Sequence, residues 1–406
     1  MKLVPIDDDK YNEYRLNAMF DCYKWDPQFR DNNTLAKHVL VITEKEAEEL
    51  KELTEAIDKE TIAAEEYLNL HQDVARPLAL PRQINREMKR MKNYDPKLHV
   101  RLMRYDFHPT TNEGWKVSEV NSDVPGGFAE ASLLPQEAIK AINGNDKKYR
   151  YINFGEIMTE AIKKKVKKNG RIFMVHCTSY SDDRQVMQFM GDRLEKEGYE
   201  IIYGTADNVN FKDQKAYSIL DNKEGEIDCI FRFTPLEWLR GIRPKRWDGY
   251  FDTITPSCNH PVAIFAQTKR FPLIWDELEK RGLKLDYWRR LLPDTQKVKG
   301  FNLKEGYIYK PACGRVGEKI SIKEACIDNE YDKIIKDVKT HPKEYLMQKK
   351  FISKPLVSPK DGKEYHVCLG SYTIEGKQAG FYSRISLVPR IDSNAADIPV
   401  LIEREK

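Results

Sequence analysis

Four polar residues in two nearby segments are the first candidates for chemistry. Arg104 and Asp106 are two positions apart in the segment RLMRYDF, and Glu119 and Asn121 are two positions apart in WKVSEVN. Because side chains alternate between the two faces of a strand, each pair would lie on one face. A strand that packs by its apolar face has no need of two carboxylates, an amide and a guanidinium on the same side.

The residues between these segments, HPTTNEG, are rich in turn formers and predict a hairpin of two antiparallel strands, over 102–107 and 115–120. If Asp106 lies opposite Glu119, the same register places the arginine opposite the asparagine. Four polar groups then converge within cross-strand reach.

Two carboxylates this close repel each other unless a cation lies between them. Asp106, Glu119 and Asn121 offer oxygen ligands, which suit Mg²⁺ better than zinc. Arg104 beside them would face a phosphate or an acid being activated. The hairpin therefore indicates a site for Mg²⁺ and phosphoryl oxygens. The alternative is a solvent-facing hairpin with a surface salt bridge.

A second cluster lies in the segment KPACGRVG. Lys310 ends the strand-like run GYIY, and the loop that follows contains Gly314 and Gly317. An ammonium and backbone N–H groups so arranged can bind phosphate oxygens, although the pattern GxxxxGK[ST] is absent. A purely structural strand–loop–strand hairpin is the alternative. Gln348 and Arg384 lie on later predicted strands that could complete a nucleotide-binding cleft.

The remaining pattern predicts a mixed α/β protein. A capping box at Thr43 and Glu46 opens a helix to about Asn69. A β-α-β unit follows in the middle of the chain, and alternating elements of this kind favour a sheet with helix-covered faces. The predicted segments are helical 84–93, strand 171–177, helix 185–198, strand 200–204, strand 228–233, helical 263–282, strand–turn–strand 306–322, helix 328–339, strand 344–351 and hairpin 364–388.

Composition excludes several classes of protein. The net charge of +4 is small for 406 residues, so electrostatics alone gives no reason to expect nucleic acid as a partner. The basic run Lys163–Lys168 ends an amphipathic pattern and is typical of a helix C-terminus, with a phosphate-polymer site as the alternative. No apolar run has the length of a membrane span, and the N-terminus lacks the pattern of a signal peptide. Seven scattered cysteines without a CxxC motif indicate reduced thiols in a cytoplasm. Cys313, within the glycine loop, is either a packing residue or a redox-sensitive thiol.

Taken together, four segments resemble the synthetase domain of the glutathionylspermidine synthase family, whose members are ATP-grasp ligases. The segments, which occur in family order from about residue 100, are RYDF…KVSEVNSDVPGGFAEAS, YIYKPACGRVG, EYLMQKKF and DGKEYHVCLGSYTIEGKQAGFYSRIS. The resemblance implies an ATP-grasp fold preceded by a helical region and a pre-ATP-grasp β-α-β domain. We predict a mainly helical N-terminal region at 1–100, a pre-ATP-grasp domain at 101–264, and ATP-grasp lobes at 265–406, divided near residue 345.

The resemblance also implies roles for individual residues. Asp106, Glu119 and Asn121 would hold Mg²⁺, with two ions expected. Arg104 would contact the transferred phosphoryl group. The residues that would bind ATP are Lys310, Gly314, Gly317, Gln348 and Arg384. Arg315 would lie in a mobile loop that closes over the reacting acid. Ser122 and Glu130 would lie near the acid substrate.

The implied reaction joins a small-molecule or peptide carboxylate to an amine, with ATP and Mg²⁺, through an acyl phosphate. Residues before 100 are too few and too helical for the Cys/His amidase domain of some members, so only synthesis is expected. The acidic run that meets the polyamine in relatives appears here with Arg184 after Asp182 and Asp183, which discourages a polyamine. These two aspartates are alternatively helix caps, which we favour.

Further departures lie in the segments Thr255–Cys258, Gln267–Arg270 and Glu318–Lys319, where relatives have Glu-Pro-x-Trp, Ser-Asn-Lys-Ala and an uncharged ending. ATP and Mg²⁺ are therefore firmer expectations than glutathione or spermidine. Amide formation between other partners, a nucleotide-binding regulator without turnover, and a basic nucleic-acid binder are the alternative functions.

Overall fold

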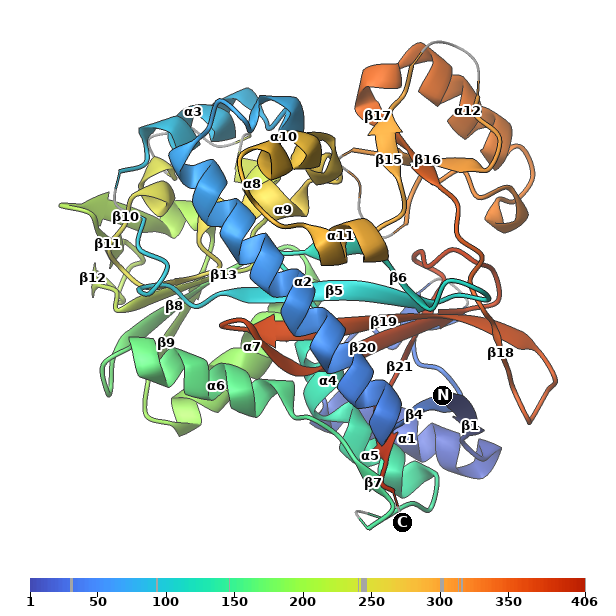
Figure 1. The fold of residues 1–406 in the computed structure, drawn as a ribbon. Helices are drawn as coiled ribbons and strands as arrows, with labels where there is room; N and C mark the ends of the chain where they lie inside the picture. Colours follow the sequence, from blue (N-terminus) through green and yellow to red (C-terminus); the bar gives the residue numbers. More distant parts are fainter. Residues whose placement is uncertain are drawn as a thin grey trace.

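The computed structural model is a mixed α/β protein, and its ribbon is shown in Figure 1. The structure describes residues 1–29, 32–92, 94–145, 147–239, 241, 247–299, 303–312, 314 and 317–405. Arg315 and Cys313 lie outside the described residues. The cysteines that are described are free thiols.

The central sheet contains the predicted hairpin. Its strands run in the order β21-β20-β19-β5-β6, with β18 paired to β19, and have the bounds β5 Leu102–Pro109, β6 Trp115–Asn121, β18 Leu356–Val357, β19 Glu364–Ile374, β20 Lys377–Ser386 and β21 Ala396–Ile398. Arg104 pairs with Asn121 and Asp106 pairs with Glu119, so the predicted register is confirmed. Residues far apart in the chain thus meet in one sheet.

Helix α2 (Glu44–Leu70) crosses one face of this sheet diagonally (Figure 1). The predicted capping box is present, because the side chains of Thr43 and Glu46 each accept from the other's backbone N–H. Leu50, Leu53 and Ile57 form its buried stripe. The sequence pattern therefore placed this helix correctly as a cover for the sheet.

A parallel sheet has the strand order β14-β13-β8-β9 and is built from the middle of the chain. The predicted β-α-β unit is confirmed here. The elements are α6 (Phe154–Lys165), β8 (Arg171–Val175), α7 (Ser181–Lys196), β9 (Glu200–Gly204), β13 (Cys229–Arg232) and β14 (Ser257–Cys258). The basic run ends α6 as expected, and Lys163 and Lys167 form ion pairs with Glu197 and Asp228.

A smaller sheet, β15-β17-β16, stands apart with helix α12 (Figure 1). Its elements are β15 (Thr295–Lys297), β16 (Tyr307–Pro311), α12 (Glu330–Thr340) and β17 (Tyr345–Lys349). The predicted second strand after the glycine loop was wrong, since β16 pairs with β17 instead. Gly317 and Lys319 have positive φ angles, which are incompatible with an extended strand there.

The segment predicted to be helical over 263–282 is helical, but in several pieces. The chain forms shorter pieces, α9 (Ile264–Gln267), a 3₁₀ turn at Phe271–Ile274 and α10 (Trp275–Lys280). Thr268 is extended, and Pro272 is accommodated at the start of the 3₁₀ turn rather than inside a helix.

The two ends of the chain meet in the sheet β1-β4-β22-β7. The remaining elements are β1 Lys2–Pro5, α1 Asp8–Asp21, β2 Gln28–Phe29, β3 Asn32–Asn33, β4 His38–Thr43, α3 Arg82–Arg90, α4 Phe128–Ser132, α5 Leu134–Ala141, β7 Tyr149–Arg150, β10 Val209–Lys212, β11 Lys215–Ser218, β12 Gly225–Glu226, α8 Leu236–Leu239, α11 Asp286–Leu291 and β22 Val400–Glu403. The division into domains at residues 100 and 265 stays a prediction.

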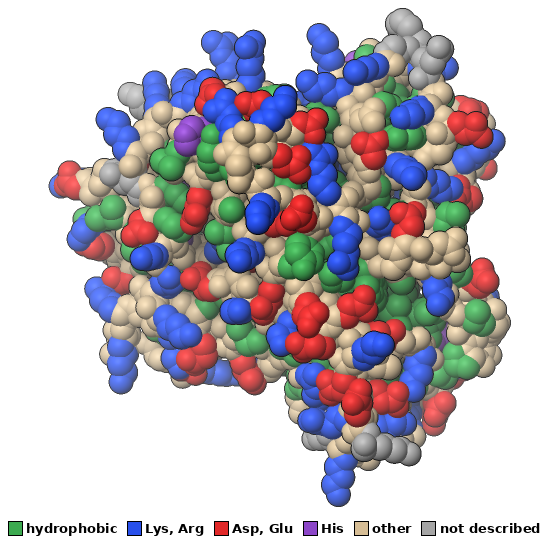
Figure 2. Space-filling model, viewed as in Figure 1, with side chains coloured by type: hydrophobic (Ala, Val, Ile, Leu, Met, Phe, Trp, Pro, Cys, Tyr) green, Lys and Arg blue, Asp and Glu red, His purple; other side chains and the backbone are tan. Residues whose placement is uncertain are grey.

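The surface in Figure 2 shows basic and acidic side chains interspersed over this face of the molecule. Within the described ranges, no helix combines the length and the apolar character that crossing a membrane requires.

Candidate active site

A cleft of about 550 Å³ lies between the central sheet, the small sheet and the start of α7. Strands β5 and β6 supply Arg104, Asp106, Glu119 and Asn121, and β16 supplies Lys310. The structure therefore brings together the two clusters that were found separately in the sequence.

Arg104 and Asp106 form a two-point ion pair. Nε of Arg104 donates to Oδ1 of Asp106 at 2.7 Å, and its Nη2 donates to Oδ2 at 3.1 Å. The third guanidinium nitrogen, Nη1, donates to the carbonyl of Gly126 at 2.9 Å, and the guanidinium lies 5.0 Å from the ring centroid of Tyr382. Asn121 donates from Nδ2 to Oδ2 of Asp106 at 2.9 Å. The arginine is thus held by the carboxylate that was expected to bind metal.

Glu119 has a cationic partner from another part of the chain. Its Oε2 lies 2.8 Å from Nζ of Lys269, which also donates to the carbonyl of Gly314 at 3.0 Å. Burial by itself would raise the pKa of Glu119, but the ammoniums of Lys269 and Lys310 lower it to about 2. Glu119 is therefore a carboxylate at any physiological pH.

Lys310 comes from β16 of the small sheet and is 6% exposed. Its Nζ donates to the carbonyl of Ser118 at 3.0 Å, which places the ammonium beside β6. The pKa of Lys310 is lowered to about 8, because burial and the neighbouring Lys269 together outweigh the opposing effect of Glu119. A buried ammonium with a depressed pKa is poised to gain from an arriving phosphate.

The side chains of Asp106, Glu119 and Asn121 are the hairpin's oxygen donors for Mg²⁺. In the part of the chain that the structure describes, there is no group of three or more His, Cys, Asp or Glu side chains arranged to hold a metal ion. The predicted ligands are two carboxylates and an amide, and protein cations now neutralise both carboxylates. The donor types fit Mg²⁺, which needs only a few protein oxygens, provided that Arg104 gives up its contact with Asp106.

The glycine loop packs against the C-terminal segment. Gly317 has a φ of +65°, and a Cβ at this position would lie 2.2 Å from the carbonyl oxygen of Ile391. Only glycine combines this backbone conformation with so close an approach. Gly314 lines the cleft, and its carbonyl receives the hydrogen bond from Lys269.

Gln348 and Arg384 lie on β17 and β20, as expected. Gln348 donates to the hydroxyl of Thr295 at 2.9 Å, and its Oε1 is buried without a partner among the described residues. A buried amide oxygen without a donor is suited to accept a hydrogen bond from a ligand. Arg384 donates to the carbonyls of Asp392 and Ala395 at 2.9 and 2.8 Å, so it braces the C-terminal segment beside the cleft.

The expected substrate-side residues have different surroundings. Ser122 is buried, and its hydroxyl donates to the carbonyl of Ala263 at 2.7 Å. Glu130 and Asp182 line the cleft. Helix α7 begins at Ser181, so the favoured interpretation of Asp182 and Asp183 as caps was wrong. Both lie in the first turn, where acids still favour the helix N-terminus.

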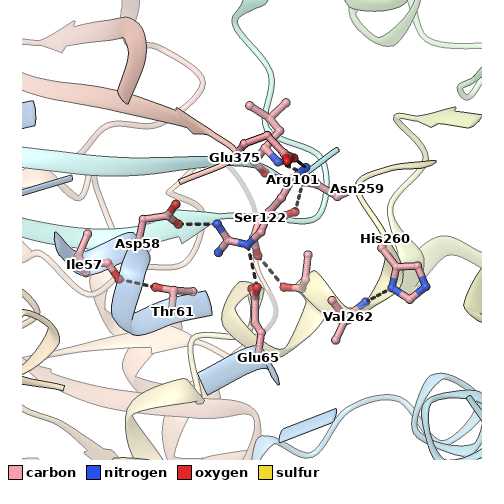
Figure 3. Close-up of polar contacts among 12 residues, drawn as sticks. Ile57, Asp58, Thr61, Glu65, Arg101, Ser122, Asn259, His260, Val262 and Glu375 are labelled. Carbon is pink, nitrogen blue, oxygen red and sulfur yellow. Dashed lines mark hydrogen bonds and ion pairs between the residues drawn. The ribbon is translucent and has the colours of Figure 1, made fainter. Parts of the chain in front are cut away.

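A buried network holds the start of β5. Arg101 donates from Nη1 to Asp58 at 2.7 Å and from Nε to Glu65 at 2.9 Å, and Figure 3 shows its guanidinium between these two carboxylates of α2. Asn259 accepts from the backbone N–H of Leu102 at 2.7 Å and donates to the carbonyls of Leu102 and Ser122. These contacts fix the ends of β5 and β6 and so position the polar residues between them.

Lys269 and Lys24 are among the cleft residues that were not predicted as site residues. Lys269 belongs to the segment Gln267–Arg270. This segment departs from the family pattern Ser-Asn-Lys-Ala but keeps its lysine. That shared lysine was the available signal. Lys24 has no such signal, because nothing near it in the sequence suggests a cleft.

The comparisons with known proteins agree with this architecture. The model of the family described as glutathionylspermidine synthase preATP-grasp matches residues 15–403, and the chain belongs to this family. A glutathione synthetase-like effector from Globodera pallida, solved in its apo form, has 13% identity and a TM-score of 0.65, with 97% of each chain covered.

A protein described as a gamma-glutamylcysteine synthetase from Methylobacillus flagellatus has 14% identity and a TM-score of 0.42, with 84% of this chain and 85% of that chain covered. A search of curated proteins gives no match. The family match and the first structural likeness confirm the predicted fold, with its pre-ATP-grasp and ATP-grasp parts.

Proposed function

We propose that this protein is an ATP-dependent ligase that joins a carboxylate to an amine through an acyl phosphate. Membership of the family supports a ligase. The observation that carries the finer proposal is the position of Lys310 directly beside β6, opposite the Asp106–Glu119 pair, in one cleft. A cation facing paired carboxylates is the arrangement that a metal-bound triphosphate requires.

In the first step, a carboxylate oxygen of the acid attacks the γ-phosphorus of ATP. The bond from this phosphorus to the bridging oxygen breaks, and ADP leaves with the electron pair. Mg²⁺, held by Asp106, Glu119 and Asn121, would neutralise phosphate charge. Lys310 contributes a buried ammonium toward the phosphates, and Arg104 contributes its guanidinium toward the transferred group.

In the second step, the amine nitrogen attacks the acyl carbon. The new C–N bond replaces the C–O bond to phosphate, phosphate leaves, and the nitrogen loses a proton. The protein supplies position and charge rather than a covalent partner. Lys269 pairs with Glu119 and donates to the carbonyl of Gly314. It would therefore connect a metal ligand to the glycine loop that is proposed to bind phosphate.

Nucleotide recognition is proposed for Gln348, Gly314, Gly317 and Arg384. The unpaired, buried Oε1 of Gln348 supports an acceptor role toward an adenine amino group. Arg384 supports the segment on which Gly317 packs. Ser122 and Glu130 stay predictions for the acid side, although the hydroxyl, the backbone N–H and the carbonyl of Ser122 all bond to other residues of the protein.

The proposal is tested by measuring ADP formation with Mg²⁺ over an array of acids and amines. Turnover that requires both an acid and an amine, and that yields one phosphate per amide, supports the ligase. Tight nucleotide binding without ADP formation for any acid and amine pair would instead indicate a nucleotide-binding regulator.

A further inference from the structure

A second charged cluster lines the same cleft and has no part in the proposed phosphoryl chemistry. At its centre is Lys24, which is 3% exposed. Its Nζ lies 2.8 Å from Asp26, 2.8 Å from Asp397 and 3.3 Å from Glu130. Three carboxylates around one primary ammonium form a receptor for an alkylammonium ion.

The four residues come from separate parts of the fold. Lys24 and Asp26 lie between α1 and β2, Glu130 lies on α4, and Asp397 lies on β21. The segment that carries Lys24 is tied to α7 by the backbone N–H of Trp25, which donates to Gln185 at 3.1 Å. The N-terminal segment therefore forms one wall of the cleft.

Other side chains of the protein already contact two of the three carboxylates. Gln185 donates to Oε1 of Glu130 at 3.1 Å, and Tyr382 donates to Asp397 at 2.6 Å. Arg384 lies 3.6 Å from Asp397, and Asp182 lines the same cleft. Oε2 of Glu130 is buried and accepts no hydrogen bond from the described residues. Burial alone would lower the pKa of Lys24, but the three carboxylates raise it well above its ordinary value, so the ammonium stays charged.

We propose that Lys24 is a specificity-determining residue: its ammonium occupies the carboxylate cluster, so the cleft takes an amine substrate that carries no second ammonium group. This inference rests on the proposed ligase function. A di- or polyamine would have to place its distal ammonium beside that of Lys24. Such a like-charge contact is costly within a buried cluster.

A purely structural role would make Lys24 a brace between the N-terminal segment and the C-terminal strands. Both roles predict that its removal lowers stability, because buried carboxylates would lose their partner. Only the specificity role predicts that the vacated cluster accepts a free amine. Amine binding therefore separates the two roles, and stability alone does not.

The test is calorimetric titration of spermidine, without ATP, into the wild-type protein and into Lys24→Ala and Lys24→Gln. The second variant keeps the length and a hydrogen-bond donor in case the first folds poorly. Lys37→Gln is the matched control, because Lys37 pairs with exposed Asp8 at the surface. We expect spermidine to bind both Lys24 variants at least about tenfold more tightly than the wild type and the control, with weaker binding at high salt.

Equal spermidine affinity in the wild type and both variants would overturn the proposal, whatever happens to their stability. If both variants fail to fold, n-butylamine in the refolding buffer should restore them, and failure to do so would also overturn it. The ligase proposal fails separately: spermidine binding can increase while no acid and amine pair supports ADP formation. Conversely, amide synthesis with unchanged spermidine affinity would refute only the role of Lys24.

Discussion

Arg104 and Asp106, two residues apart on β5, neutralise each other through a two-point ion pair in the cleft. The proposed metal ligand and the proposed phosphate-binding arginine are therefore partners in this structure. Nucleotide and Mg²⁺ would exchange this contact for two new ones, with Asp106 on the metal and Arg104 on the phosphoryl group.

Asp106→Asn should lower the rate of ADP formation about 10²–10³-fold while the fold is retained. The neutral amide supplies no negative charge to the metal site and cannot form the ion pair with Arg104. The measurement is steady-state ADP formation, with circular dichroism for the fold. Glu113→Gln is the matched control, because Glu113 is a half-exposed acid on the same hairpin whose side chain pairs with Lys116. Near-normal turnover of Asp106→Asn would contradict the assignment.

The pKa of Lys310 predicts how nucleotide affinity depends on pH. Below about 8 the ammonium is present, and above this value the free protein loses it. Binding of a triphosphate then requires uptake of a proton, so affinity should fall roughly tenfold per pH unit above the pKa. Titration calorimetry in buffers of different ionisation enthalpy measures this proton uptake.

Lys310→Arg retains its charge throughout this range and should show no such dependence. Equal slopes for the wild type and Lys310→Arg would mean that another group governs the pH effect.

Gly317→Ala should destabilise the packing of the glycine loop on the C-terminal segment. The left-handed backbone costs about 1–2 kcal/mol for alanine. The 2.2 Å approach to the carbonyl of Ile391 adds a steric term of about 1–3 kcal/mol. Gly306→Ala isolates the first contribution, because Gly306 has a φ of +73° and no atom near its missing Cβ. Urea unfolding of both variants should therefore differ, and equal free energies of unfolding would exclude the steric contact.

The buried Arg101 network predicts a pH dependence of stability. Burial raises the pKa of Glu65 from 4.5 to about 7, although Arg101 opposes the shift. The folded state then holds a proton that the unfolded state releases, so this contribution is complete below pH 4.5 and is lost as the pH rises through about 7. Its full size is on the order of 3 kcal/mol.

Glu65→Gln keeps an acceptor for Arg101 and should flatten this pH dependence. The measurement is the free energy of unfolding across the interval between the two pKa values. Equal slopes in the wild type and in Glu65→Gln would show that Glu65 is ionised in the folded protein. The histidines His99 and His108, whose pKa values burial lowers to about 4, contribute the same slope to both proteins.

Much of the hairpin could be predicted because local rules decide it. The period of two and the turn-rich connection fixed the pairing of Asp106 with Glu119, and the reciprocal hydrogen bonds of Thr43 and Glu46 fixed the start of α2. The failures were also local: the positive φ of Gly317 and Lys319 ended a strand that the residue types favoured.

The charge partners could not be predicted, because they depend on tertiary packing. Lys269 reaches Glu119 from a broken helical segment, and Lys24 reaches Asp397 from the other end of the chain. No periodicity in the sequence encodes such contacts. The hypothesis that the hairpin needs a bound cation stays a prediction, and in this structure Arg104 and Lys269 pair with its two carboxylates.

The most direct test of the account is a crystal structure of the protein with Mn²⁺ and a non-hydrolysable ATP analogue. The account predicts an anomalous peak for Mn²⁺ bonded to oxygens of Asp106 and Glu119 and to the triphosphate, with Lys310 on phosphate oxygens and Arg104 released from Asp106. A Mn²⁺ peak elsewhere, with the Arg104–Asp106 pair intact beside the bound nucleotide, would contradict it.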